Sequence, residues 1–299
     1  MRTRESPHTL NVPVAAADMV TLLKLEFEKL VRARSFYLSF VVLIGFVVLM
    51  LWGFYTYSLH KTGGQVEFKY TYENPSYFNG LIFSLYSAYF AFQLIIPISV
   101  SILAGTQMAS EARSGTLRSL LTRPISRSRL YFGKYLTSVL SVFSLLAFFI
   151  LFNLLVGLLL VGWGDLSLYP GPLNLVQEPG RLSQSEALLR FFYAVFTGTW
   201  SLLTLATLAF LMSVLFENPI VASFTALTLY VMLNVIGRVD FFVDLRPYLF
   251  TTDMEFWRDV FKPEIPVNEL LYRACRCGMY SVSFLLAGLL VFERKDVLS

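Results

Sequence analysis

The sequence predicts an all-α integral membrane protein with six transmembrane helices, and three observations lead to this fold class. Of the 299 residues, 56% are hydrophobic and only 15% are charged, whereas soluble domains carry about 25% charged residues. Several uncharged apolar stretches reach the roughly 20 residues that a helix needs to cross a bilayer. Short polar segments separate these stretches, and one of them is strongly basic, as is typical of cytoplasmic loops.

Six stretches qualify as membrane spans. The first five contain no Asp, Glu, Lys, Arg or His, which argues against a transporter driven by protons or ions. The sixth includes Arg273 and Arg276 near one end, where long basic side chains can snorkel to the membrane surface. Pro97 is expected to kink the second span, and Pro219 starts the fifth, where a missing N–H costs least. The expected spans are residues 36–57, 81–105, 136–163, 191–216, 219–237 and 270–292.

The segments that flank the transmembrane domain, residues 36–292, have distinct compositions. Residues 1–17 are polar and predict a disordered cytoplasmic tail, and residues 293–299 form a second tail. Residues 18–35 predict an amphipathic elbow helix in the membrane interface that leads into the first span, with Asp18 as its N-cap. A soluble helix that packs on a partner is the alternative. The apolar stripe of this helix comprises Met19, Leu22, Leu23, Phe27, Leu30 and Val31.

The loops on the other side of the membrane carry weaker signals. Tyr70 and Tyr72 alternate as a short strand would, and residues 164–190 are expected to be irregular. Residues 252–261 predict a short helix along the outer interface. Such a helix could equally cover the spans or contact a substrate.

The distribution of Lys and Arg predicts that both termini are cytoplasmic. In this orientation the cytoplasmic segments hold 14 basic residues, and the outer segments hold 10 that are offset by 12 acids. Residues 111–134 alone contribute six basic residues against one acid. We therefore expect a multi-pass protein of the cytoplasmic (inner) membrane.

The basic loop between the second and third spans predicts a short bounded helix. Gly115 is expected to end the preceding helix, Pro124 prevents the short helix from continuing, and Ser126 can cap the third span. Between these limits, apolar side chains recur at helical spacing and form a stripe that is available for burial against another surface. These residues are Leu117, Leu120, Leu121 and Ile125. A topogenic signal with a tight turn is the alternative, and it explains the arginines but not the leucines.

This loop resembles a known signature. Glu111, Gly115-Thr116-Leu117, Leu120-Leu121, Pro124, Arg127 and Gly133-Lys134 are similar to the E-x3-GTL-x2-LL-x2-P-x2-R…GK pattern of ABC transporter type-2 permeases. The C-terminal FERKDVLS resembles the F-x-R-[RK]-D-[IV] ending of that family. With the elbow helix and the six spans, the resemblance covers nearly the whole chain. It extends to bacterial permeases of antibiotic or ion exporters and of nitrous-oxide-reductase maturation.

The resemblance implies that the loop holds a coupling helix, which docks into a cytoplasmic ABC ATP-binding subunit. Docking would bury the leucines and place arginines around them. The residues assigned to ATPase coupling by this motif match are Glu111, Gly115, Thr116, Leu117, Leu120, Leu121, Arg123, Pro124 and Arg127.

The function expected from this resemblance is that of the transmembrane permease subunit of an ATP-driven ABC exporter. A P-loop is absent from the sequence, because Ser128 stands where its first Gly is needed and Tyr135 follows Gly133-Lys134. ATP and Mg²⁺ are therefore expected on the partner, and a second permease chain, identical or related, is expected to complete a dimer. The alternative is a non-transporting scaffold or mechanotransmitter docked to the same ATPase.

No catalytic, cofactor or metal site is expected on this chain. The outer acids, such as Asp240 and Asp253, lack the convergent spacing of an enzyme site. Cys275 and Cys277 could suggest Cu(I), but residues two apart point to different faces of a helix. The basic residues show no aromatic-basic platform, so nucleic acid is not an expected partner. The expected partners are the ATP-binding subunit, the second permease chain and the lipid bilayer.

Overall fold

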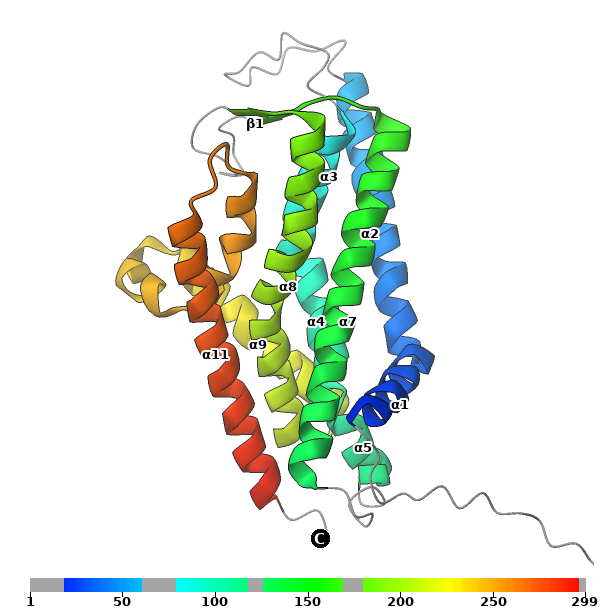
Figure 1. Cartoon of the computed structure of the whole chain (residues 1–299), viewed down its shortest axis with the longest axis vertical. Coiled ribbons are helices and arrows are strands. Elements are labelled where there is room, and N and C mark those ends of the chain that lie inside the picture. Colours follow the sequence, from blue (N-terminus) through cyan, green and yellow to red (C-terminus); the bar gives the residue numbers. More distant parts are fainter. Residues whose placement is uncertain (1–18, 61–78, 118–125, 169–179, 296–299) are drawn as a thin grey trace, which may run out of the picture.

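A computed structural model describes residues 19–60, 79–117, 126–168 and 180–295, and Figure 1 shows these residues as an elongated bundle of helices. Helix α1 (Met19–Arg32), helix α5 (Ala109–Ser114) and the C-terminal end of helix α11 (Val267–Arg294) lie at one end of the bundle, which we call the basal end. The opposite, distal end carries a small antiparallel hairpin of strands β1 (Leu166–Leu168) and β2 (Gly180–Leu182).

Six helices of the described residues are long and apolar enough to cross a membrane, which confirms the predicted fold class. The sixth extends back through Arg273 and Arg276, as predicted, and the third begins nearer the basic loop than predicted, at Arg127. These spans are helix α2 (Arg34–His60), helices α3 (Gly80–Phe90) and α4 (Ile96–Gly105) with π-helix η3 (Ala91–Ile95) between them, helix α7 (Arg127–Val156) with π-helix η4 (Gly157–Val161), helix α8 (Gln184–Leu215), helix α9 (Pro219–Arg238) and helix α11.

The second span changes its helical pitch where a kink was predicted. Pro97 has no N–H to donate to the carbonyl of Gln93, and the π-helix η3 contains Gln93. The chain remains helical through this point because residues 91–95 take up the wider turn. Local caps act as expected elsewhere: Asn218 caps α9 and Pro219 occupies its first turn.

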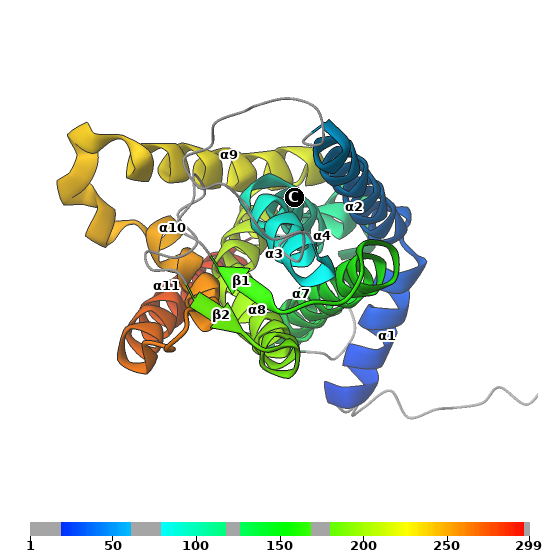
Figure 2. The same cartoon turned by 90° about the horizontal axis from the view of Figure 1, so that it is seen from above.

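Helix α8 forms the centre of the bundle. It packs against α4, α7, α9 and α11, and most of its apolar side chains are buried. Figure 2 shows helices α2, α9 and α11 at the periphery of the bundle, seen from the distal end. Each of them exposes an apolar face. Such faces are suited to contact with lipid.

The connection from α9 to α11 consists of short helices. They are 3₁₀-helix η5 (Asp240–Tyr248), helix α10 (Phe250–Asp253) and 3₁₀-helix η6 (Met254–Phe261). Residues 252–261 are helical, as predicted, and η6 packs on α8 and buries Phe256, Trp257 and Phe261, as expected of a helix that covers the spans. The burial of these aromatic side chains favours packing over an interfacial position.

The arginines of the sixth span pair with this connection. Arg273 contacts Asp259 at 3.2 Å and Arg276 contacts Asp253 at 3.2 Å, and both acids are buried. The predicted snorkelling of these arginines is therefore corrected: their charges meet carboxylates of α10 and η6.

Candidate functional site

The candidate site lies at the basal end, where the chain leaves α5 and enters α7. Helix α5 ends at Gly115, whose φ of 73° lies in the left-handed region that suits glycine. The side chain of Ser126 accepts a hydrogen bond from the Arg129 N–H and caps α7. Both boundaries were predicted from the sequence. They fix the two ends of the basic loop, and residues 118–125 between them lie outside the described residues.

The structure places five of the residues assigned by the motif and leaves four undescribed. Leu120, Leu121, Arg123 and Pro124 belong to the undescribed segment. The described ones are Glu111, Gly115, Thr116, Leu117 and Arg127.

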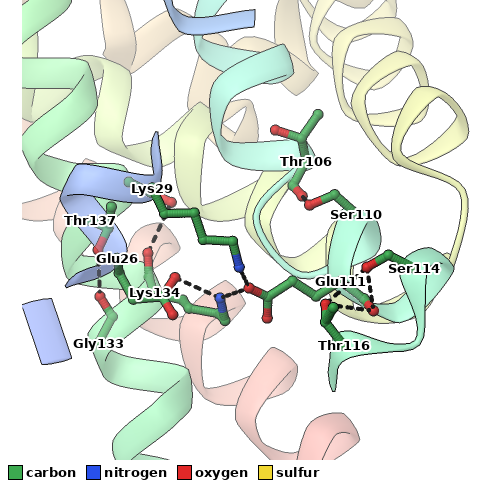
Figure 3. A network of polar contacts seen from close by, with 11 residues as sticks. Glu26, Lys29, Thr106, Ser110, Glu111, Ser114, Thr116, Gly133, Lys134 and Thr137 are labelled. Carbon is green, nitrogen blue, oxygen red and sulfur yellow. Dashed lines mark hydrogen bonds and ion pairs between the residues drawn. The ribbon is translucent and has the colours of Figure 1, made fainter. Parts of the chain in front are cut away.

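Glu111 stands at the centre of a network of charges that is buried except at Lys29, whose side chain is 58% exposed (Figure 3). Its Oε1 lies 2.8 Å from Nζ of Lys134 on α7 and also accepts a bond from Nζ of Lys29 on α1. Nζ of Lys134 lies 2.7 Å from Oε2 of Glu26 on α1. Two carboxylates and two ammonium groups thus join α1, α5 and α7.

The burial of these charges determines how strongly they affect the stability of the fold. Lys134 is 1% exposed and Glu111 is 3% exposed, so neither charge is solvated by bulk water. An unpaired charge at this depth is strongly destabilising, whereas a paired one is tolerated. The partial burial of Lys29 and then the charge of Lys134 lower the pKa of Lys29, while Glu26 raises it. The network therefore holds its elements together only while every charge keeps its partner.

Leu117 departs from the expectation of a free leucine stripe. Its side chain is 5% exposed and belongs to a small apolar core at the basal end. This corrects the expectation that docking would bury Leu117, because the chain already buries it. The residues of this core are Met108, Leu117, Leu130, Tyr131, Phe210, Val214 and Phe292.

Arg127 connects the loop to the last helix. Its guanidinium donates to the carbonyl of Glu293 in the last turn of α11 at 3.1 Å and to the carbonyl of the C-cap residue Lys295 at 3.0 Å. Carbonyls at a helix C-terminus lack intrahelical partners, and a cation satisfies them well. Lys295 in turn donates to the carbonyl of Val214 at 3.0 Å. Arg127 thus fixes the basal end of α11 beside the start of α7.

Sequence reasoning did not single out Glu26, Lys29 and Lys134 as site residues. One signal was available: Glu26 stands four residues after Leu22 and four before Leu30, on the apolar stripe. An acid on a stripe that will be buried needs a basic partner. Lys134 was part of the matched motif and was counted only as a loop charge. Its partners could not be identified, because they lie 108 and 23 positions away along the chain.

The charged residues of this site connect helices to one another. Both ammonium groups already contact carboxylates, and within residues 19–60, 79–117, 126–168 and 180–295 no group of three His, Cys, Asp or Glu could hold a metal ion. Glu111 links α5 to α1 through Lys29 and to α7 through Lys134.

The sequence of this chain matches a known protein family. A sequence profile described as "ABC-2 family transporter protein" matches residues 22–177, which is 156 of 299 residues and includes most of α1 and all of α5 and α7. The chain belongs to the ABC-2 transporter family. This family consists of transporter membrane proteins, and the six apolar helices of the chain fit the description of a permease.

One relative of this ABC-2 permease comes from Bacillus subtilis (strain 168) and carries the name "Uncharacterized protein YhcI". The two chains are 25% identical over 210 residues. The match spans 69% of this chain and 66% of the relative, slightly less than two thirds of the relative's length.

Proposed function

We propose that this permease subunit couples ATP hydrolysis on a separate ATP-binding subunit to the export of a substrate across the cytoplasmic membrane. The basal end would face the cytoplasm and the loop at residues 118–125 would dock on the ATP-binding subunit. One observation carries the proposal: Glu111, which stands just before this loop, is held in a buried charge network with Lys134 and Lys29. A docking loop needs such a rigid attachment to move the spans.

The route of transmission follows from the contacts. A push on the loop reaches α5, and Glu111 passes it to α7 through Lys134 and to the interfacial helix α1 through Lys29. Arg127 passes it to the basal end of α11. The buried pair of Glu111 with Lys134 suits this task because its partners separate only at high cost. ATP and Mg²⁺ would remain on the partner, and this chain would carry no hydrolytic site.

Two copies of the permease, or this chain and a related one, would form the transport unit with two ATP-binding subunits. ATP-driven closure of these subunits would push the docking loops and switch access between the two membrane faces. Transport of substrate into or out of vesicles that contain both subunits and ATP tests this step. ATPase docking without any transport would instead support a membrane scaffold or mechanotransmitter.

Substitution in the loop tests the docking role. Leu120→Asp combined with Leu121→Asp places two carboxylates in the proposed cleft and removes two buried Leu contacts worth about 1.5–3 kcal/mol each. Binding of the ATP-binding subunit should fall by several orders of magnitude, at about 1.4 kcal/mol per factor of ten. Arg118→Gln with Arg129→Gln should weaken binding modestly and reduce its salt dependence.

The measurement is co-purification of the co-expressed ATP-binding subunit at two ionic strengths. A topology reporter serves as the control, because the six basic residues of the loop region are unchanged in the double Asp variant. Normal insertion together with wild-type retention of the ATP-binding subunit would show that the loop is only a topogenic signal.

A further inference from the structure

A groove of about 740 Å³ lies between helices α7, α8 and α11. Tyr135 of α7 and Trp200 of α8 line it together with residues 275–285 of α11. Gly278 is part of this lining, and a Cβ at its position would lie 3.3 Å from the ring of Trp200. The absence of a side chain at Gly278 thus keeps this part of the groove open.

Two hydrogen bonds between helices mark the ends of the groove. Near the basal end, the hydroxyl of Tyr131 on α7 donates to the carbonyl of Leu285 on α11 at 2.8 Å. Near the distal end, the indole N–H of Trp200 donates to the carbonyl of Ala274 at 2.9 Å. From Ala274 to Leu285 the helix rises about 16 Å. This length is about half of the roughly 30 Å hydrocarbon thickness, which is the depth of one leaflet.

The groove lies within the hydrocarbon core of the membrane. Its three helices are all candidate spans, Trp200 stands at the middle of α8, and residues 275–285 surround the middle of α11. The middle of a span is the part farthest from both membrane surfaces. Met279 is 63% exposed and Trp200 is 48% exposed, so the groove opens to the outside of the bundle. Acyl chains therefore meet its mouth, rather than water or head groups.

The hydrogen-bond donors that line the groove already have partners within the protein. The hydroxyls of Ser281 and Ser283 donate to backbone carbonyls one turn earlier in α11, at 2.9 and 2.8 Å. The hydroxyl of Tyr135 lies 3.4 Å from that of Thr207. The thiol of Cys275 is only a weak donor. The groove therefore favours an apolar ligand, since a polar one would lose its hydrogen bonds to water.

The dimensions of the groove match an acyl chain better than a helix. A volume of about 740 Å³ over a length of about 16 Å corresponds to a mean cross-section of about 46 Å². A helix with its side chains is about 10–12 Å across and so needs about 80–110 Å². A helix of a second chain could cover the groove but could not enter it. An extended hydrocarbon chain is thinner and can lie along its full length.

We propose that the groove binds one acyl chain of a bilayer phospholipid as a resident lipid of this protein. The chain lies over Gly278 and against the ring of Trp200. It fills the space between α7 and α11 on the distal side of the bond from Tyr131 to Leu285. Its contacts supply the packing that Gly278 lacks. The inference does not depend on the proposed transport function.

Filling the groove with protein side chains tests the proposal. Gly278→Leu places a side chain in the groove from α11, and Leu203→Phe narrows it from α8. Gly45→Leu is the matched control, because it adds the same side chain to α2 where a Cβ meets no atom within 4 Å. Each full-length chain is reconstituted with phosphatidylethanolamine and phosphatidylglycerol, extracted in a mild detergent and analysed by native mass spectrometry.

The wild type and Gly45→Leu should retain one phospholipid per chain, and both filling variants should lower the lipid-bound fraction several-fold. Added phospholipid should also raise the melting temperature of the wild type more than that of either filling variant, because a ligand stabilises only a protein that binds it. The melting temperature in detergent alone shows whether each variant is folded. If one filling variant does not fold, the other carries the test.

Two results would overturn the proposal. One is retention of phospholipid at the wild-type level by a folded filling variant, or a wild type that retains none. The other is a wild-type dimer that dissociates in the filling variants without any loss of lipid, because a second chain would then cover the groove.

Discussion

Lys134 shows how one side chain can decide the arrangement of three elements. It is a cation within the third span, it is 1% exposed, and its two contacts reach Glu26 on α1 and Glu111 on α5. A lysine in this position has no stabilising alternative, since its long side chain does not reach bulk water. The buried ammonium therefore requires both carboxylates to stay where they are.

We predict that Lys134→Met destabilises the protein by about 3–5 kcal/mol, because Glu26 loses its described cation and Glu111 retains only Lys29. Thermal unfolding in detergent measures the change. Lys24→Met on the exposed face of α1 is the control and should have little effect. Adding Glu26→Gln to Lys134→Met should recover part of the loss, because the carboxylate that Lys134→Met leaves without its described cation becomes a neutral amide. A double variant as unstable as the sum of the single variants would contradict the pairing.

Asp253 is a second buried ionisable group. Its burial predicts that the free energy of unfolding depends on pH. Burial raises the pKa of Asp253 above its ordinary value of 3.8, and the neighbouring Arg276 and Arg273 lower it less. Protonation of Asp253 thus favours the native state. Its stabilising contribution is complete below the unfolded-state pKa of 3.8 and is lost as the pH rises through the raised folded-state pKa.

Asp253→Asn keeps this position neutral at every pH. Relative to the wild type, the variant should gain stability as the pH rises from about 4 to about 7, the range above the unfolded-state pKa. Thermal unfolding at a series of pH values measures the difference. A difference that stays constant over this range, or that changes in the opposite direction, would show that Asp253 does not titrate as its burial implies.

At the scale of elements, the second and third spans pack through small and polar residues. The side-chain amide of Asn153 donates to the carbonyl of Ser84 at 2.8 Å, and the hydroxyl of Ser84 donates to the carbonyl of Asn153 at 3.2 Å. Next to this pair, a Cβ on Gly157 would lie 2.6 Å from the carbonyl oxygen of Gly80. Close backbone contact of this kind is a common means of helix association in membranes.

We predict that Gly157→Val separates α3 from η4 and destabilises the bundle by about 1–3 kcal/mol, the usual cost of overpacking. The matched control is Gly45→Val on α2, where a Cβ meets no atom within 4 Å. Both variants add the same side chain to a transmembrane helix. Equal melting temperatures for the two variants in detergent would show that the contact of Gly80 with Gly157 does not hold the spans together.

At the scale of the whole molecule, α1 and the end of α11 lie at the same basal end (Figure 1). An even number of spans requires this, and the basic residues of the loop and of α1 gather there. Positive charge near the spans favours the cytoplasmic side. The arrangement therefore agrees with a basal end that faces the cytoplasm.

We predict that a reporter fused after Ser299 is cytoplasmic and that a tag inserted between Gly63 and Gly64 reacts with an impermeant reagent from outside intact cells. The six basic residues of the loop determine this result through the positive-inside rule. Labelling with and without permeabilisation makes the comparison. A tag that reacts only after permeabilisation would reverse the orientation and, with it, the docking role of the basal loop.

The features that depend on residues close together in the chain are encoded directly in the sequence. The six spans follow from uninterrupted apolar length, and the limits of the basic loop follow from the backbone freedom of Gly115 and the capping hydroxyl of Ser126. Pro97 and Pro219 likewise act on the helix turn in which they stand. These signals are local, so the pattern of residues along the chain contains them completely.

Contacts between residues that are far apart in the chain depend on the tertiary fold. It placed Leu117 in an internal core, paired Arg276 with Asp253, and brought Lys134 between Glu26 and Glu111. Every one of these outcomes depends on how helices from different parts of the chain pack, and helical periodicity gives the face of a residue but not its neighbour. A buried charge or a buried leucine acquires its role from that neighbour, because burial removes water as the alternative partner.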